Sequence, residues 1–471
     1  MLFCSYVFVF LFLPIVLLGY FRIGRCLPPV WAHLWLVMAS FIFYACFKLE
    51  YLWIILLSIG VNYACVYMLE RMNWSRGKRL AVMWGGIAFN LALLGYFKYA
   101  MFVLENLNDA FGMNFTLYKI ILPLGISFFT FQQIACLADL YKSRDTPKYT
   151  LVNYALFVTF FPQLAAGPIV HHRDMMPQFD LPECGKPNYL NLSAGLHLFA
   201  VGLFKKLVIA DFFGVWAKNG MDTWSSLPEL TFVQAWFSVL AYVFQLYFDF
   251  SAYSDMAMGT GRMFNIHLPL NFNSPYRSCS IQEFWRRWHI TLGNFLMHYV
   301  YFPLGGSRKG EARAYVNLFV VFLLCGIWHA ANWAFVLFGF MHGAAMVLNR
   351  FWSKMGMVMP RALGWLMTFL FLAVTYPMVR MEKLEHVFRC WRGMFMSSEF
   401  SLKSLADITD PVEMPLVYLA AGLLLVLCFP NAAVRNRSFQ PTLANGMATV
   451  VLLVVAVLHM SRITPFLYFN F

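Results

Sequence analysis

Residues 314–349, AYVNLFVVFLLCGIWHAANWAFVLFGFMHGAAMVLN, contain no Lys, Arg, Asp or Glu. A helix needs about 20 apolar residues to cross the hydrocarbon core of a bilayer, so this run is too long for one plain crossing. Gly326 and Gly339 interrupt it, and it is either two membrane segments or one long tilted segment. The stretch therefore predicts an α-helical membrane protein.

The composition of the whole chain agrees with that prediction. Of the 471 residues, 61% are hydrophobic and only 12% are charged, whereas soluble domains carry about 25% charged residues. These figures exclude a disordered chain, a collagen-like fibre and a coiled coil. They also argue against a water-soluble globule, because so few charges could not cover so much apolar surface.

Apolar runs of membrane-crossing length recur along the sequence. We expect about eleven to thirteen transmembrane and re-entrant helices in a single membrane-embedded domain that covers residues 1–471. The first run has no basic residue before Arg22, which is typical of a retained span and not of a cleaved signal peptide. The expected spans are 2–21, 30–47, 51–69, 80–97, 120–138, 151–170, 190–217, 230–248, 314–349, 362–379, 415–434 and 438–461.

The formal net charge of +13 fits a basic cytoplasmic face better than nucleic-acid binding, because basic loops set the orientation of membrane proteins. No nucleic-acid-binding signature is found. Alternating the expected spans across the membrane then puts the N-terminus outside. The residues behind this argument are Arg22, Arg25, Arg71, Arg76, Lys78, Arg79, Lys142, Arg144 and Lys148 in the inner loops, and Lys48–Glu50 in an outer loop.

Residues 249–313 break the apolar pattern, because they mix aromatic residues with many charges. Polar backbone at membrane depth is tolerated when it is packed in protein or lines a water-filled cavity. We therefore expect amphipathic helices and re-entrant loops around an aqueous cavity or at the interface. Ser280 and Glu283 form a capping box that starts a short helix at about 281, on which Glu283 and Arg287 pair. Alternatively, Trp285–His289 is an interfacial anchor belt.

His329 lies in the middle of the charge-free run. An ionisable residue inside the membrane is a functional candidate, and Asn332, three residues on, would share its helix face and could orient it. Alternatively, His329 packs against a neighbouring helix through a hydrogen bond. As a general base it could deprotonate a hydroxyl for acyl transfer, with Asn, Trp or Arg donors stabilising the oxyanion. A proton relay in a transporter would suit the same residues.

The cysteines are scattered and form no CxxC pair, and no set of His, Cys, Asp and Glu has metal-ligand spacing. We therefore expect no metal and no bound cofactor. Hydrolase-elbow, Walker and dinucleotide-binding motifs are likewise not found.

Five segments in order along the chain resemble the membrane-bound O-acyltransferase family, in the bacterial branch that O-acetylates alginate or peptidoglycan. They are Phe160–Ile169 (FFPQLAAGPI), Asp249–Asp255 (DFSAYSD), Phe284–His289 (FWRRWH), Tyr301–Gly310 (YFPLGGSRKG) and Trp328–Trp333 (WHAANW). The N-terminal apolar block and the C-terminal Pro465–Phe471 are also similar to this branch. Ala330 departs from the pattern, because many members have Gly after the embedded histidine.

The resemblance implies a funnel-shaped multi-helix fold with a thinned centre in the bacterial inner membrane. There, acetyl-CoA from the cytoplasm would supply an acetyl group to a periplasmic or extracellular O-acetyltransferase or esterase-like partner, which esterifies a polysaccharide or peptidoglycan. His329 would be the general base or acyl-handling residue, and His289 would assist it. A D-alanyl transferase acting on teichoic acid is an alternative in the same superfamily. The implied substrate- and tunnel-lining residues are Gln163, Asp249, Tyr253, Asp255, Trp285, Arg286, Arg287, Trp328 and Asn332.

Overall fold

The computed structural model describes the chain except for residues 119, 144–147, 227–228, 410–412, 463, 465 and 468–471. Arg144 of the orientation argument therefore lies outside the described residues, as does the C-terminal segment 465–471 apart from Phe466 and Leu467. Within the described ranges every regular element is a helix. The all-α architecture predicted from composition is confirmed.

The chain divides into two compact units. The first consists of Met1–Val201, Tyr253–Leu270 and Phe439–Leu453, and the second of Gly202–Ala252, Asn271–Ser438 and Val454–Phe471. That the chain works as one acyltransferase domain stays a prediction.

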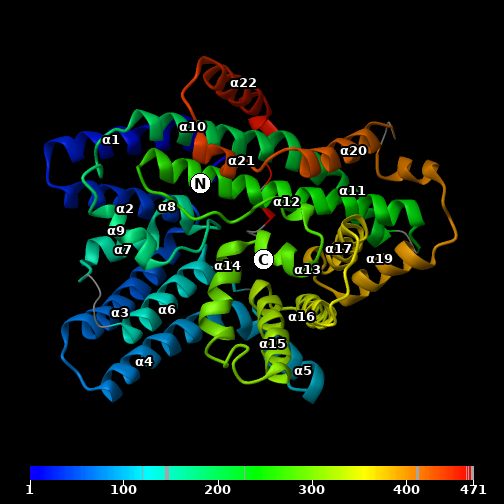
Figure 1. Cartoon of the computed structure of the whole chain (residues 1–471), viewed down its shortest axis with the longest axis horizontal. Helices are drawn as coiled ribbons and strands as arrows, with labels where there is room; N and C mark the ends of the chain where they lie inside the picture. Colours follow the sequence, from blue (N-terminus) through cyan, green and yellow to red (C-terminus); the bar gives the residue numbers. More distant parts are fainter. Residues whose placement is uncertain are drawn as a thin grey trace. The chain divides into compact units, whose positions relative to one another are not determined.

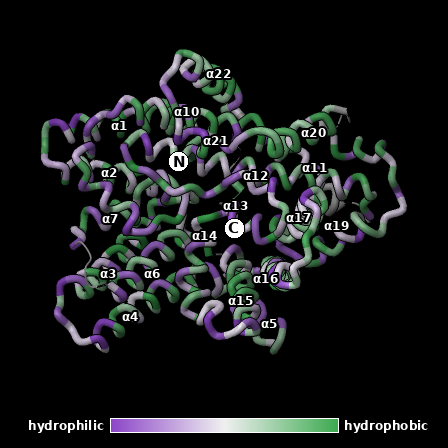
Figure 2. The backbone as a smooth tube through the Cα atoms, viewed as in Figure 1, coloured by the Kyte–Doolittle hydropathy of each residue, from purple (hydrophilic) through white to green (hydrophobic). Residues whose placement is uncertain are grey.

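The first unit is built from the N-terminal helices. In Figure 2 the loop that joins α3 to α4 is hydrophilic, whereas both helices carry many hydrophobic residues. A π-helical turn at Gly95–Tyr99 joins α4 to α5 in one continuous helix, which therefore extends beyond the expected span 80–97. The helices are α1 (Leu13–Cys26), α2 (Pro29–Ala45), α3 (Leu52–Arg71), α4 (Arg76–Leu94), α5 (Ala100–Phe111), α6 (Ile126–Lys142), α7 (Leu151–Thr159), α8 (Phe161–Leu164), α9 (His172–Phe179), most of α10 (Tyr189–Phe204) and part of α22 (Leu443–His459).

The second unit contains the polar region and the charge-free run. It includes α11 (Asp211–Ser226), most of α12 (Phe232–Met263), α13 (Ile281–Arg287), α14 (Ile290–Leu296), α15 (Glu311–His329), α16 (Trp333–Lys354), α17 (Arg361–Thr375), α18 (Pro377–Arg380), α19 (Leu384–Met396), α20 (Glu413–Cys428) and α21 (Ala432–Arg435).

Among the described residues, seven helices are long and apolar enough to cross a membrane, and α2 and α22 are shorter apolar helices. The predicted spans around α6, α7, α10 and α12 are also helical, but these helices are either too short or not apolar enough to be counted among the seven. The seven are Phe8–Cys26, Leu49–Arg71, Arg76–Phe111, Glu311–His329, Trp333–Lys354, Arg361–Arg380 and Leu416–Ser438. The chain is a multi-pass membrane protein.

The charge-free run forms two helices, α15 and α16, which lie side by side (Figure 1). The break falls at residues 330–332 and not at the two glycines. A Cβ on Gly326 would lie 2.8 Å from the Gly339 Cα, and a Cβ on Gly339 would lie 2.7 Å from the Phe322 carbonyl oxygen. The glycines therefore let the two helix backbones approach closely, as small residues do in membrane helix pairs.

The predicted start of the polar region at residue 249 is wrong, because α12 extends beyond it. The helix continues through Asp249 to Met263, although we expected amphipathic pieces from residue 249 onward. The buried Asp249 carboxylate accepts a hydrogen bond from the Lys206 ammonium at 2.7 Å and another from the Leu467 backbone N–H at 3.0 Å. Lys206 also pairs with Asp211 at 2.7 Å. A buried charge needs such partners, and with them the helix passes through unbroken.

Candidate active site

Helix α13 begins at Ile281, where its sequence predicts. The Ser280 hydroxyl accepts the Glu283 backbone N–H at 3.1 Å, and the Glu283 carboxylate accepts the Cys279 backbone N–H at 2.8 Å. Glu283 also pairs with Arg287 at 2.8 Å, one helical turn later. The capping box and the ion pair are confirmed, and they fix the short helix that carries Trp285 and leads into His289.

His289 joins α13 to α14 in a left-handed backbone conformation, with φ of 46°. Such a conformation costs about 1–3 kcal/mol in a residue other than Gly, and it persists where the surroundings hold it. Here the Asn271 carbonyl accepts the Ile290 backbone N–H at 2.9 Å. The Asn271 side chain contacts His289 Nδ1 at 3.1 Å and Thr291 Oγ1 at 3.0 Å. Asn271 therefore holds both backbone and ring of this turn.

The same contacts assign the tautomer of His289. Asn271 Oδ1 also accepts the Thr291 backbone N–H at 3.4 Å, so this atom is the carbonyl oxygen of the amide. His289 Nδ1 must then donate to it, and Nε2 is the proton-accepting nitrogen of the ring. Only 1% of the His289 surface is exposed. This burial lowers the pKa of the imidazole well below its usual value of 6.5, so the ring is neutral at pH 7.

His329 is the last residue of α15, and its ring lies near that of His289, with centroids 6.4 Å apart. The Trp328 ring is close to both, at 4.8 Å from His329 and 6.3 Å from His289. Two histidines 40 positions apart in the sequence thus meet.

Asn332 does not share a helix face with His329, because the helix ends between them. Its side chain instead accepts the Phe335 backbone N–H at 2.9 Å and caps the start of α16. The expectation that Asn332 shares a helix face with His329 is therefore wrong, and its role in orienting His329 stays a prediction. Its position three residues after His329 predicted a shared face only if the helix continued.

A small cavity of about 30 Å³ lies beside His329. Apart from His329 its lining is aromatic and aliphatic, and comes from α12, α13, α16, α18 and the adjoining turns. The lining residues are Leu246, Phe250, Phe284, Trp285, Trp288, His329, Phe335, Phe338, Tyr376 and Val379.

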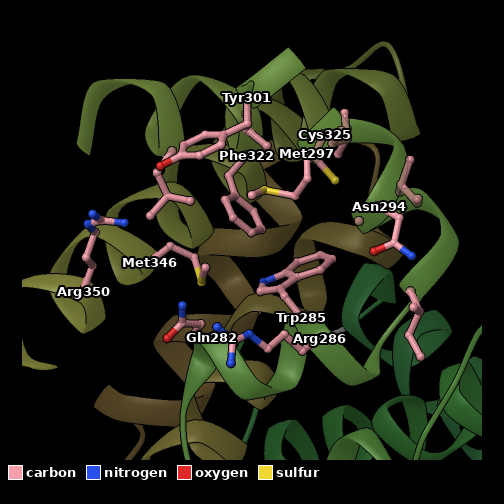
Figure 3. Close-up of a pocket in the computed structure, with 16 residues that line it drawn as sticks. Gln282, Trp285, Arg286, Asn294, Met297, Tyr301, Phe322, Cys325, Met346 and Arg350 are labelled. Atoms are coloured by element: carbon pink, nitrogen blue, oxygen red, sulfur yellow. The ribbon is translucent and has the colours of Figure 1, made fainter. Parts of the chain in front are cut away.

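Trp285 lines this cavity and also a second, larger one of about 260 Å³. Figure 3 shows the larger cavity, with Phe322, Met297 and Cys325 across from Trp285 and with Arg350 and Gln282 to one side. The Trp285 indole N–H donates to His342 Nδ1 at 3.1 Å, and His342 Nε2 then donates to Thr375 Oγ1 at 3.1 Å. Since His342 and Thr375 are buried, this chain of hydrogen bonds fixes the Trp285 ring.

The two arginines expected at the tunnel differ in position. Arg286 is exposed and lines the larger cavity. Arg287 lines neither cavity, because its guanidinium pairs with Glu283 and donates to the Asn273 carbonyl at 3.2 Å. Trp288 and His289 are buried, which does not fit an interfacial anchor belt.

The remaining expected residues are not among the lining residues of either cavity. Asp249 belongs to the Lys206 ion network of the second unit. The other three lie in the first unit, where the Tyr253 hydroxyl accepts the Ala166 backbone N–H at 3.3 Å and Gln163 donates to the Phe157 carbonyl at 2.8 Å. Asp255 is buried there as well. Their tunnel-lining role stays a prediction.

Three residues of the site were not predicted from the sequence. They are Asn271, His342 and Thr375. His342 could have been found, because it lies in the same charge-free run whose burial argument selected His329. Asn271 and Thr375 carry no local signal, since their partners lie 18 and 33 positions away. Within the described part of the chain, no group of three or more His, Cys, Asp and Glu is placed to hold a metal.

Fold and site together define a multi-pass membrane protein with two neighbouring histidines beside an apolar cavity. The model of the membrane-bound O-acyltransferase family matches residues 143–381, and this range contains both histidines and both cavities. The chain belongs to this family, and the protein is an acyltransferase.

The named relatives match between 49% and 100% of this chain. It is 40% identical to a peptidoglycan O-acetyltransferase of Helicobacter pylori over 100% of this chain and 98% of the relative. A probable alginate O-acetylase of Pseudomonas aeruginosa is 38% identical over 86% of this chain and 77% of the relative. A teichoic acid D-alanyltransferase of Streptococcus thermophilus is 27% identical over 49% of this chain and 57% of the relative.

Proposed function

We propose that this protein is an O-acetyltransferase of the bacterial inner membrane, with acetyl-CoA from the cytoplasm as donor and His329 as general base. The observation that carries the proposal is the position of His329 beside a cavity of about 30 Å³ and next to His289. The names of the relatives from Helicobacter pylori and Pseudomonas aeruginosa support acetyl transfer over D-alanyl transfer.

In the proposed reaction His329 removes the proton of an acceptor hydroxyl while the hydroxyl oxygen attacks the thioester carbonyl carbon. A carbon–oxygen bond forms, and the carbon–sulfur bond to CoA breaks. The CoA thiolate leaves and takes the proton back from the His329 imidazolium, so that free CoA and an acetyl ester are the products.

His289 and Trp328 are the proposed assistants of this step. His289 is held neutral and in one tautomer by Asn271, so that it positions the acceptor or the His329 ring without exchanging a proton with the medium. The Trp328 indole N–H is a donor close to His329 and suits the oxyanion that develops on the thioester carbonyl.

The final acceptor that we propose is the hydroxyl of an exported polysaccharide or of peptidoglycan. The group whose hydroxyl is acetylated beside His329 passes the acetyl group on to an extracytoplasmic O-acetyltransferase or esterase-like partner, which esterifies this final acceptor. The 40% identity to the peptidoglycan enzyme over the whole chain favours peptidoglycan over alginate. In this arrangement the N-terminus lies outside and the basic loops face the cytoplasm.

The test uses the full chain in nanodiscs with radiolabelled acetyl-CoA and measures release of free CoA and label on an added peptidoglycan fragment or alginate oligomer. His329→Ala should lower the rate by at least 10²-fold, the lower end of the contribution of a general base. His298→Ala, which removes an exposed histidine, should leave the rate unchanged.

Retained activity in His329→Ala would defeat the assignment of the base. If the wild type releases no CoA, the extracytoplasmic partner is added, and turnover should then appear. Transfer from a D-alanyl thioester of a carrier protein, without transfer from acetyl-CoA, would identify the D-alanyl alternative instead.

A further inference from the structure

The small cavity beside His329 has room for a group of limited size. A cavity needs about 10–15 Å³ of such volume to hold one water molecule. The volume of about 30 Å³ therefore holds two or three groups of that size. An acetyl group has three heavy atoms, whereas a butyryl group has five.

The residues that line this cavity are held by contacts with one another and with neighbouring side chains. The Trp285 indole is held by His342. The Tyr376 hydroxyl lies 3.5 Å from the Tyr276 hydroxyl, which itself donates to the Val243 carbonyl at 2.7 Å. Trp288 stacks on Phe284, with ring centroids 5.5 Å apart. Interiors packed in this way do not expand freely to admit extra methylenes.

Trp285 stands between two aromatic neighbours that belong to different cavities. Phe338 lines the small cavity together with His329, and its ring centroid lies 6.4 Å from that of Trp285. Phe322 lines the large cavity, at 5.1 Å from Trp285. Trp285 therefore contacts Phe338 in the small cavity, which His329 also lines, and Phe322 in the large cavity.

We propose that the apolar wall beside His329 selects the length of the acyl group, and that Phe338 sets its limit at two carbons. This wall consists of Trp285, Phe335, Phe338 and Val379. The proposal rests on the proposed acyl transfer at His329. One methylene too many in an apolar pocket costs roughly 10–200-fold in rate. Propionyl transfer should therefore be at least tenfold slower than acetyl transfer, and butyryl transfer at least a hundredfold slower.

The experiment compares kcat/KM for acetyl-, propionyl-, butyryl- and hexanoyl-CoA in the full chain in nanodiscs, with CoA release as the readout. Phe338→Ala should raise the ratio of butyryl to acetyl turnover by at least tenfold. Phe322→Ala is the matched control, because it shortens the same residue type on the other side of Trp285. Its ratio should equal that of the wild type.

A second variant protects the test against misfolding of Phe338→Ala. Val379→Ala removes two methyl groups from the same cavity and should raise the propionyl to acetyl ratio. A wild type that uses butyryl-CoA as well as acetyl-CoA would overturn the proposal. A changed ratio in Phe322→Ala alone would do so as well, since it would put the acyl group in the large cavity. Absence of transfer from every thioester would instead count against the proposed function.

Discussion

His289 combines a strained backbone with a neutral buried ring, and the stability of the protein should therefore depend on pH. Burial lowers the pKa of this imidazole below the value of 6.5 that it has in the unfolded chain. Below pH 6.5 the unfolded chain then binds one proton more than the folded one at this position. The free energy of unfolding should fall as the pH falls, by up to about 1.4 kcal/mol per pH unit for this group.

His289→Gln keeps an N–H donor for Asn271 but does not titrate. The loss of Tm between pH 6.5 and 5.5 should be smaller in this variant than in the wild type, measured in the same detergent. His298→Gln, at an exposed position, should keep the full wild-type loss. Equal pH dependence in all three proteins would contradict a buried neutral His289.

The close packing of α15 against α16 depends on Gly326 and Gly339, which we expected to interrupt the apolar run. Gly339 faces the Phe322 carbonyl and the Leu323 Cα, where an added Cβ would lie at 2.7 and 3.0 Å. Both of those atoms belong to the backbone of α15, so the helices must separate to admit a methyl group. Overpacking of this kind costs about 1–3 kcal/mol.

Gly339→Ala should accordingly lower the Tm of the protein in detergent. The control is Gly85→Ala in α4, where nothing lies within 4 Å of the added Cβ. That variant should be neutral or slightly stabilising, since Ala is favoured over Gly inside helices by about 0.5–1 kcal/mol. A Gly339→Ala protein as stable as Gly85→Ala would show that the close approach of the two helices is not needed.

For the molecule as a whole, the distribution of charge predicts the orientation in the membrane. Lys48 and Glu50 precede α3, whereas Arg71 and Arg76 flank the loop that follows it. Arg79 contributes less than the sequence suggests, because it is buried and donates to the Leu69 and Leu140 carbonyls. The remaining basic residues should still hold the loop at residues 72–75 in the cytoplasm.

Alkaline phosphatase, which is active outside the cytoplasm, should be active when fused after Glu50 and inactive when fused after Asn73. A green fluorescent protein fused at the same two positions serves as the complementary reporter, because it should fluoresce only after Asn73. The reverse pattern would invert the proposed orientation, and with it the side from which acetyl-CoA enters.

Features that depend on composition and on neighbouring residues could be predicted from the amino-acid sequence. Membrane-crossing length and the low charge content predicted an all-α multi-pass protein, and the Ser280–Glu283 spacing predicted the start of α13. Burying an ionisable ring in the membrane is costly, and for that reason His329 could be predicted as a functional candidate before its neighbours were known. The predictions of the helical fold and of the start of α13 are confirmed, because helix formation, capping and membrane partition are governed by local chemistry. The functional role of His329 stays a prediction.

The contacts between residues that are distant in the sequence depend on how the helices pack in the tertiary structure. Helix α15 ends at His329, so that Asn332 caps α16, and the packing brings His289 to His329. It also pairs Asn271 with His289, His342 with Trp285 and Lys206 with Asp249. The physical reason is that a buried polar group must find a partner wherever the packing of helices provides one. The size of the cavity beside His329 likewise depends on side chains from several helices, and no single segment of sequence contains it.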